Sequence, residues 1–272
     1  MNLKREVPLM KREISGSGDS VVLVPGGLTG WLSWIPHAEM LAETRRVIRL
    51  QLLNVEFGLA GAPLPAEYSA GYEVTALGNT LDKLGIEQAD FAAWSYGGEI
   101  TLSYAVHNQQ RVRSLTLIEP PAFWVLRSRG PLPKEVLEKQ EFFQKLTTNN
   151  VNEEQLVSFL HNVDLVPTDV DPRTLSPWPV WLKHRQSLRM ADAPFRHEDS
   201  IELVRAFEKP VLLVKGESMN QNFHHGVIDV LVGELPNVEV VTFPGGHGVP
   251  VVSMEPFLER FSRFLSEHAL EQ

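Results

Sequence analysis

The 272-residue sequence contains no cysteine. This absence excludes disulfide bonds, thiolate nucleophiles and zinc sites built from cysteine. Nine histidines are present, but they form no HExxH pattern. The adjacent pair His224 and His225 would point about 100° apart on a helix, which is poor geometry for binding one ion. We therefore expect no metal, and no feature of the sequence calls for another cofactor.

Long apolar runs are also absent. No stretch approaches the roughly 20 residues that cross a bilayer, and the first residues, MNLKREVPLMKREISG, lack the apolar segment of a signal peptide. We expect a cytoplasmic protein that does not bind membranes. Dense clusters of Lys and Arg are missing as well, and the net charge of -9 would repel a phosphate backbone. Nucleic acid is therefore not expected as a partner, and a small molecule is.

The remaining composition is that of a folded globular protein, with 43% hydrophobic and 22% charged residues. A chain of this length can bury a sizeable core. We expect one large domain with an insertion, present as a monomer or a homodimer.

Short apolar segments alternate with segments of helical periodicity along most of the chain. The predicted strands cover residues 21–24, 47–50, 91–94, 114–118, 211–214 and 238–243. The predicted helices cover residues 34–42, 74–84, 100–107 and 223–235, followed by a last one around 257–265. This alternation predicts an α/β fold, a mostly parallel twisted sheet with helices on both faces.

The alternation stops between residues 121 and 200. Residues 134–146 and 153–160 are helical in pattern, and a proline-rich piece follows at residues 176–179. The insertion begins and ends beside predicted strands, at the carboxyl edge of the sheet, where ligands of such sheets bind. We therefore expect a core formed by residues 1–120 and 201–272 and a helical lid formed by residues 121–200.

Ser95 is the candidate nucleophile. The segment Ala93-Trp94-Ser95-Tyr96-Gly97 matches the nucleophile elbow G-x-S-x-G with a small Ala in place of the first Gly. The turn from strand to helix is tight, so small residues are needed where backbone segments touch. The motif also lies between a predicted buried strand and a predicted helix, as the elbow requires.

Three segments, VVLVPGGLTGW from Val21, AAWSYGG from Ala92 and PGGHGVPVVSMEPF from Pro244, resemble the α/β-hydrolase superfamily in sequence and order. The resemblance covers the chain outside the lid. It implies that His247, on the loop after the final strand, is the base for Ser95. It also implies an oxyanion hole formed by the amides of Gly27 and Tyr96. Pro25-Gly26 stands where members commonly have His-Gly, which leaves the amide of Gly27 available.

The acid of the triad departs from the common family pattern G-E-x-D. Gly216-Glu217-Ser218-Met219 places Met219 at the usual Asp position, and a thioether cannot stabilise an imidazolium. Glu119, directly after the strand at 114–118, is the preferred candidate, since some hydrolases take their acid from this strand. Glu217 remains an alternative acid.

A second and weaker resemblance is to zearalenone-type lactonases, which combine a V-P-x-G loop, a Glu after this strand and a P-V-W segment in the lid. Here these are residues 24–27, Glu119 and Pro179-Val180-Trp181. Certain lid-bearing dehalogenases are also similar, although they use Asp where Ser95 stands. Trp181 is the candidate substrate contact, and Arg185 and Arg189 would serve one acidic group if they pointed inward.

These observations indicate a serine hydrolase that cleaves an ester, lactone or thioester of a small, largely apolar substrate through an acyl-enzyme. Two alternatives stay open. The same residues could perform non-hydrolytic or carbon–carbon bond-cleaving chemistry. Met219 instead favours a ligand-binding protein with weak catalysis.

Overall fold

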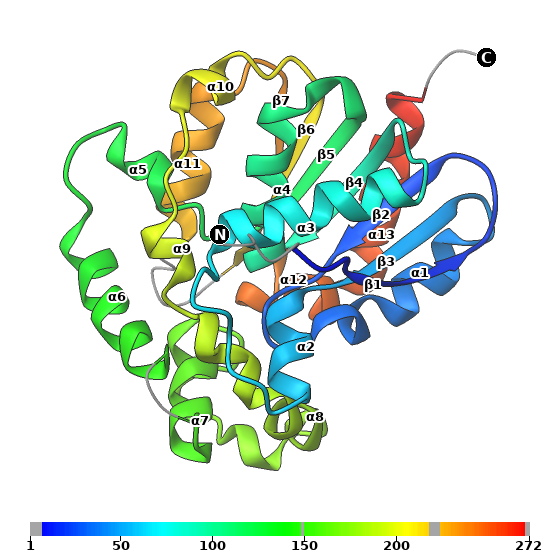
Figure 1. The fold of residues 1–272 in the computed structure, drawn as a ribbon. Helices are drawn as coiled ribbons and strands as arrows, with labels where there is room; N and C mark the ends of the chain where they lie inside the picture. The colour runs from blue at the N-terminus through cyan, green and yellow to red at the C-terminus, as the bar shows by residue number, and fades with distance from the viewer. Residues whose placement is uncertain (1–6, 148–149, 218–223, 270–272) are drawn as a thin grey trace, which may run out of the picture.

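The computed structural model describes residues 7–147, 150–217 and 224–269. Strands and helices alternate through much of the chain and form a single sheet flanked by helices (Figure 1). The strands are β1 (Lys11–Ser15), β2 (Ser20–Val24), β3 (Arg46–Gln51), β4 (Ala89–Trp94), β5 (Val112–Ile118), β6 (Val211–Glu217) and β7 (Val238–Pro244). The spatial order is β1-β3-β2-β4-β5-β6-β7, with β1 antiparallel to β3 and the other pairs parallel.

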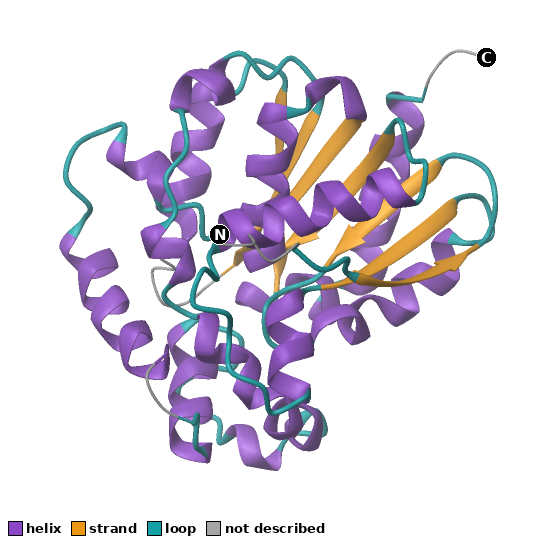
Figure 2. Cartoon of the chain, in the orientation of Figure 1, coloured by secondary structure: helices purple, strands orange, loops and turns teal. Residues whose placement is uncertain are grey.

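Figure 2 shows the helices on both sides of the strands. The α-helices of the core are α1 (Ile35–Leu41), α2 (Leu53–Leu59), α3 (Ala70–Lys83), α4 (Tyr96–His107), α10 (Ile201–Arg205), α11 (His224–Glu234), α12 (Val249–Val252) and α13 (Met254–Glu267). Short 3-10 helices are η1 (Gly30–Trp34), η2 (Gln109–Arg111), η3 (Pro172–Thr174), η4 (Arg185–Met190) and η5 (Gly246–Gly248). The predicted mostly parallel α/β sheet is confirmed.

The two faces of the sheet bury separate apolar clusters because successive strand residues point to opposite faces. Val21 and Leu23 of β2 pack in one cluster with Phe257 and Phe261 of α13. The intervening Val22 of β2 packs in the other cluster, which also contains apolar residues of α3 and α4. Strands buried on both faces explain the nearly continuous apolar runs in the sequence.

The segment between β5 and β6 contains helices and no strand within its described residues. Its α-helices before α10 are α5 (Trp124–Arg127), α6 (Lys134–Thr147), α7 (Glu153–Asn162), α8 (Trp178–His184) and α9 (Ala193–Arg196). Figure 1 shows α6 at the left, α7 at the lower left and α8 at the bottom near the centre. Trp178 and Pro179 of the proline-rich piece begin α8, where Pro179 occupies the first turn, a position that needs no amide donor. We call residues 121–200 the lid.

Several short elements were not predicted from the sequence, and β1 and α2 are two of them in the core. The antiparallel edge strand β1 is exposed along its length, so it lacks the apolar pattern of the other strands. The short helix α2 directly follows β3 and packs against η4 of the lid. In the part of the chain that the structure describes, no helix combines the length and hydropathy needed to cross a membrane.

Candidate active site

Ser95 occupies a strained turn between β4 and α4. Its backbone φ is 53°, in the left-handed region that non-glycine residues rarely adopt. The amide of Ser95 donates to the carbonyl of Ile118 at 2.9 Å, which ties the turn to the end of β5. A Cβ at Gly97 would lie 2.3 Å from the carbonyl oxygen of Pro25, so only glycine fits there. These contacts fix the Ser95 hydroxyl at the carboxyl edge of the sheet.

His247 lies within hydrogen-bond distance of Ser95. Its Nε2 is 2.9 Å from Ser95 Oγ, and its Nδ1 is 2.9 Å from Glu119 Oε2. A carboxylate at Nδ1 holds the proton on that nitrogen, which leaves Nε2 to accept the serine hydroxyl. The structure therefore brings Ser95, His247 and Glu119 into the arrangement of a nucleophile, a base and an orienting acid.

Glu119 follows β5 directly and is fully buried. Its φ of 43° is also in the left-handed region, and its Oε1 accepts a hydrogen bond from the amide of Gly216 at 2.9 Å. The other candidate acid, Glu217, is exposed at the end of β6. Met219 lies outside the described residues. The geometry favours Glu119 because its carboxylate lies 2.9 Å from Nδ1 of His247 and is held in place by the amide of Gly216.

The loop that carries His247 is held from two sides. The indole N–H of Trp94 donates to the carbonyl of His247 at 2.9 Å, and the amide of His247 donates to the carbonyl of Asp164 at 3.0 Å. Asp164 belongs to the lid and has a φ of 58°. A Cβ on Gly246 would lie 2.7 Å from atoms of Asp164, so the loop and the lid meet at close contact.

The two predicted oxyanion-hole residues lie beside Ser95, each at the border of a cavity. Gly27, in the loop after β2, borders one cavity, and Tyr96, the first residue of α4, borders the other. The carbonyl of Gly27 accepts from the side-chain amide of Asn54 at 2.7 Å. The phenol of Tyr96 lies 3.3 Å from the phenol of Tyr68.

The buried carboxylate of Glu73, which was not predicted from the sequence, connects the Asn54–Gly27 contact with the Tyr68–Tyr96 contact. Glu73 accepts hydrogen bonds from the amides of Leu53 and Asn54 at 3.0 and 2.8 Å and from the hydroxyl of Tyr68 at 2.7 Å. Burial raises the pKa of Glu73 to about 7. A lone Glu on a helix face gives no sequence signal for such a role, because its partners come from distant elements.

Two cavities adjoin Ser95, and both are apolar. Aromatic and aliphatic residues form most of both walls, and Trp181 lines the larger cavity. Among the described residues that line them, none is Lys, Arg, Asp or Glu. Arg185 and Arg189 do not serve an acidic group there. Their guanidinium groups donate to backbone carbonyls, including those of Val151 and Ala62, so they join segments of chain.

His224 is a second histidine at the site, although no sequence motif pointed to it. Its ring stacks on that of His247, with centroids 4.6 Å apart and planes inclined by 10°. It also borders the smaller cavity. Within the described residues, one acidic group has the spacing of a metal site, formed by Glu239, Glu267 and His268. None of these three lines either cavity.

Comparison with known proteins gives related sequences and folds. A 2-hydroxymuconate semialdehyde hydrolase from Pseudomonas sp. strain CF600 is 35% identical over 132 residues, which are 43% of this chain and 46% of that protein. The chain thus spans less than half the length of the curated relatives it matches.

Many solved structures share the fold, and two are given as examples. An esterase from Exiguobacterium antarcticum superimposes with a TM-score of 0.75 at 18% identity, covering 94% of this chain and 95% of the other. A meta-cleavage product hydrolase from Pseudomonas fluorescens IP01 gives 0.69 at 16% identity, covering 96% and 95%. Residues 19–252 match the family model described as the alpha/beta hydrolase fold, and the chain therefore belongs to the α/β-hydrolase family.

Proposed function

We propose that this hydrolase cleaves a carboxylic ester of a small, largely apolar molecule through an acyl-enzyme on Ser95. The observation that carries the proposal is the chain of contacts from Ser95 Oγ to His247 and on to Glu119, each 2.9 Å long. The hydroxyl is a weak nucleophile until a base accepts its proton, and this arrangement supplies that base.

In the first step Ser95 Oγ attacks the ester carbonyl carbon while its proton passes to His247 Nε2. Glu119 stabilises the imidazolium, and the amides of Gly27 and Tyr96 are proposed to stabilise the oxyanion. The bond to the alcohol oxygen then breaks as His247 returns the proton to that oxygen. Water attacks the acyl-enzyme in the second step, gives one proton through His247 to Ser95 Oγ, and releases the carboxylic acid.

Hydrolysis of a carbon–carbon bond is the second candidate. The curated relatives include hydrolases of 2-hydroxymuconate semialdehyde and of 2-hydroxy-6-oxo-2,4-heptadienoate, whose names denote carboxylate substrates. A carboxylate in an apolar cavity without a cationic partner is costly. Because the described residues of both cavities include no Lys or Arg, we favour the neutral ester. None of the relatives and structures named above is a lactonase, and lactone hydrolysis is not proposed.

The test compares Ser95→Ala, Glu119→Gln and Glu217→Gln on a p-nitrophenyl ester, with folding checked by circular dichroism. We expect no turnover from Ser95→Ala and a kcat lower by about 1,000- to 10,000-fold for Glu119→Gln, because the amide cannot stabilise the imidazolium. Glu217→Gln is the matched control and should retain wild-type activity. Equal activity of Ser95→Ala and wild type would contradict the mechanism.

The same preparation is offered 2-hydroxy-6-oxo-2,4-heptadienoate. Rapid loss of this compound with slow ester cleavage would replace the ester proposal by the carbon–carbon one. If the folded wild type hydrolyses neither substrate class, a ligand-binding function becomes the better explanation.

A further inference from the structure

Ser95 separates two cavities of very unequal size. The smaller has a volume of about 40 Å³ and the larger about 680 Å³. Ser95, Phe159, Val163 and Met190 line both and form the boundary between them. A substrate bound across Ser95 therefore places one part on each side.

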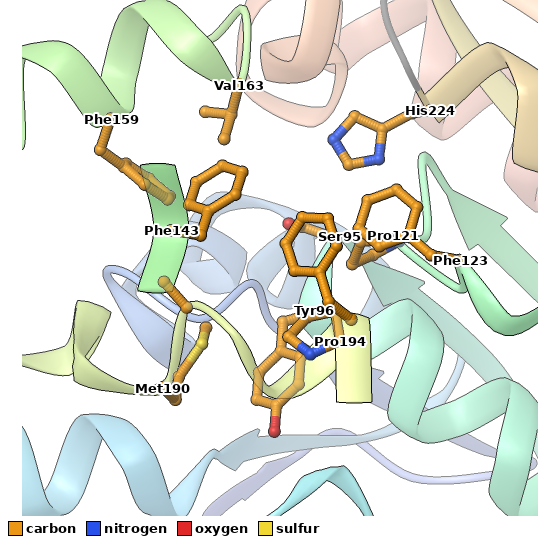
Figure 3. Close-up of a pocket in the computed structure, with 12 residues that line it drawn as sticks. Ser95, Tyr96, Pro121, Phe123, Phe143, Phe159, Val163, Met190, Pro194 and His224 are labelled. Atoms are coloured by element: carbon orange, nitrogen blue, oxygen red, sulfur yellow. The ribbon is translucent and has the colours of Figure 1, made fainter. Parts of the chain in front are cut away.

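Aromatic rings form much of the wall of the smaller cavity. Phe123 and Phe195 stack with centroids 4.4 Å apart, and Phe143 packs on Phe195 at 5.5 Å. Figure 3 shows the side chains of Phe123 and Phe143 beside Ser95, with His224 nearby. A single water needs about 10–15 Å³ of such volume, so this side of Ser95 holds about three groups of that size. Close packing of buried rings keeps the space from widening at low cost.

The larger cavity has the volume of a site for a large organic group, since such pockets typically measure about 300–1,000 Å³. Its lining includes Leu32, Val180, Trp181, Val251 and Val252. Val251 and Val252 are 57% and 64% exposed, so the cavity has an apolar rim that reaches the surface. An apolar group bound there would cover side chains that otherwise face water.

The position of His247 assigns the two cavities to the two parts of an ester. His247 lines the larger cavity and is not part of the wall of the smaller one. The imidazole must deliver its proton to the leaving alcohol oxygen, which requires that oxygen to lie within hydrogen-bond reach of Nε2. The alcohol therefore occupies the larger cavity, and the acyl chain occupies the smaller one on the other side of Ser95.

From this arrangement we propose that the preferred substrates are esters of a short acyl group, with two or three carbon atoms, and a bulky apolar alcohol. The inference rests on the proposed ester hydrolysis and adds the identity of each part of the substrate. It also explains why the described residues of both walls include no Lys, Arg, Asp or Glu, because neither part of such a substrate carries a charge.

The wild-type protein is tested on two series of alkyl esters, with acid release followed by titration at constant pH. One series keeps decanol and lengthens the acid from acetate to butyrate and octanoate. The other keeps acetate and enlarges the alcohol from ethanol to hexanol and decanol, whose similar acidity leaves leaving-group chemistry unchanged. We expect kcat/KM to fall about tenfold or more along the first series, because the longer acyl chains exceed the volume of the smaller cavity. Along the second series it should rise about tenfold or more, since apolar burial in the larger cavity grows with each methylene.

Two variants separate the cavities. Phe143 lines only the smaller cavity, and Trp181 lines only the larger one. Phe143→Ala should raise the ratio of butyrate to acetate cleavage about tenfold, whereas Trp181→Ala should weaken the preference for decanol and leave the acyl preference unchanged. Phe143→Leu is the smaller change to use if Phe143→Ala does not fold.

The outcomes distinguish this inference from the function on which it rests. A flat response in either series, or a preference for long acids with small alcohols, overturns the assignment of the cavities while ester hydrolysis stands. Absence of cleavage for every ester by the folded protein overturns both.

Discussion

Glu73 links the two residues proposed to form the oxyanion hole, although it contacts neither directly. Through Asn54 it holds the carbonyl of Gly27, and through Tyr68 it reaches the phenol of Tyr96. Displacements of about 1 Å at catalytic groups can reduce rates about 100-fold. A change at Glu73 should therefore act on the transition state more than on substrate binding.

Glu73→Gln tests this positioning role. The amide nitrogen would face the backbone donor of Leu53 or Asn54, which leaves one buried donor unpaired. We expect kcat to fall about 10- to 100-fold with KM nearly unchanged. Steady-state kinetics of Glu73→Gln beside Glu99→Gln checks the expectation, because Glu99 is also fully buried but has no hydrogen-bond partner among the described residues. A rise in KM at constant kcat, or the same loss in both variants, would show that Glu73 is merely structural.

At the scale of the element, helix α7 carries one wall shared by both cavities and depends on its first turn. The side chain of Asn152 accepts from the amide of Gln155, whose own side chain accepts from the amide of Asn152, both at 2.9 Å. Phe159 lies further along this helix, and Val163 is its C-terminal cap. The N-terminal cap formed by Asn152 and Gln155 therefore helps to place the helix that carries the boundary between the two cavities.

Asn152→Ala removes one of the two hydrogen bonds of this capping box, because only the bond from the amide of Gln155 uses the side chain of residue 152. The expected cost is about 1 kcal/mol of folding free energy, which corresponds to a Tm lower by roughly 2 °C in a chain of this size. Asn152→Ser keeps an acceptor at the cap and should retain most of the stability. Thermal unfolding by circular dichroism makes the comparison, and equal losses for Ala and Ser would assign the effect to something other than capping.

The elements that the sequence predicted differ from β1 and α2 in burial or in length. Strands such as β2 and β5 are buried on both faces, so their sequences are continuously apolar. Strand β1 is exposed, and α2 is only seven residues long, so neither produces a periodic pattern. Tertiary pairing with β3 forms β1, which local sequence cannot reveal.

Over the whole molecule, the residues of the candidate site also divide into those that local sequence predicts and those that depend on tertiary contacts. Ser95 and His247 lie in local motifs, and the position of Glu119 after β5 was enough to expect it near them. Contacts between distant segments were not predictable, because they depend on three-dimensional packing. Glu73 and His224 are the examples, and the inward orientation considered for Arg185 and Arg189 failed for the same reason.

Buried acids also shape how global stability depends on pH. Burial raises the pKa of Glu99 well above its usual value. A raised acid pKa contributes stability that is fully present below the unfolded pKa, near 4.5, and is lost as the pH rises toward the folded pKa. The loss is about 1.4 kcal/mol for each pH unit within that window.

Glu99→Gln removes this titration. The Tm of the variant minus that of the wild type should become more positive between pH 5 and pH 8, as measured by thermal unfolding. The exposed Glu217→Gln serves as the comparison and should show a constant difference. A constant difference for Glu99→Gln would mean that the carboxyl is ionised in the folded protein.

The contact between Asp164 and the loop of His247 restricts how lids can be exchanged between relatives. A transplanted lid must bring a carbonyl to the amide of His247 and a residue at position 164 that tolerates a positive φ, for which Asn, Asp and Gly are suited. A chimaera joined at residues 121 and 200 that lacks this residue would bind new ligands yet leave His247 poorly aligned. Grafts that retain residues 163–165 of this chain should keep His247 in place. Junctions between the two sequences are therefore needed on either side of these residues, inside the lid, as well as at its ends.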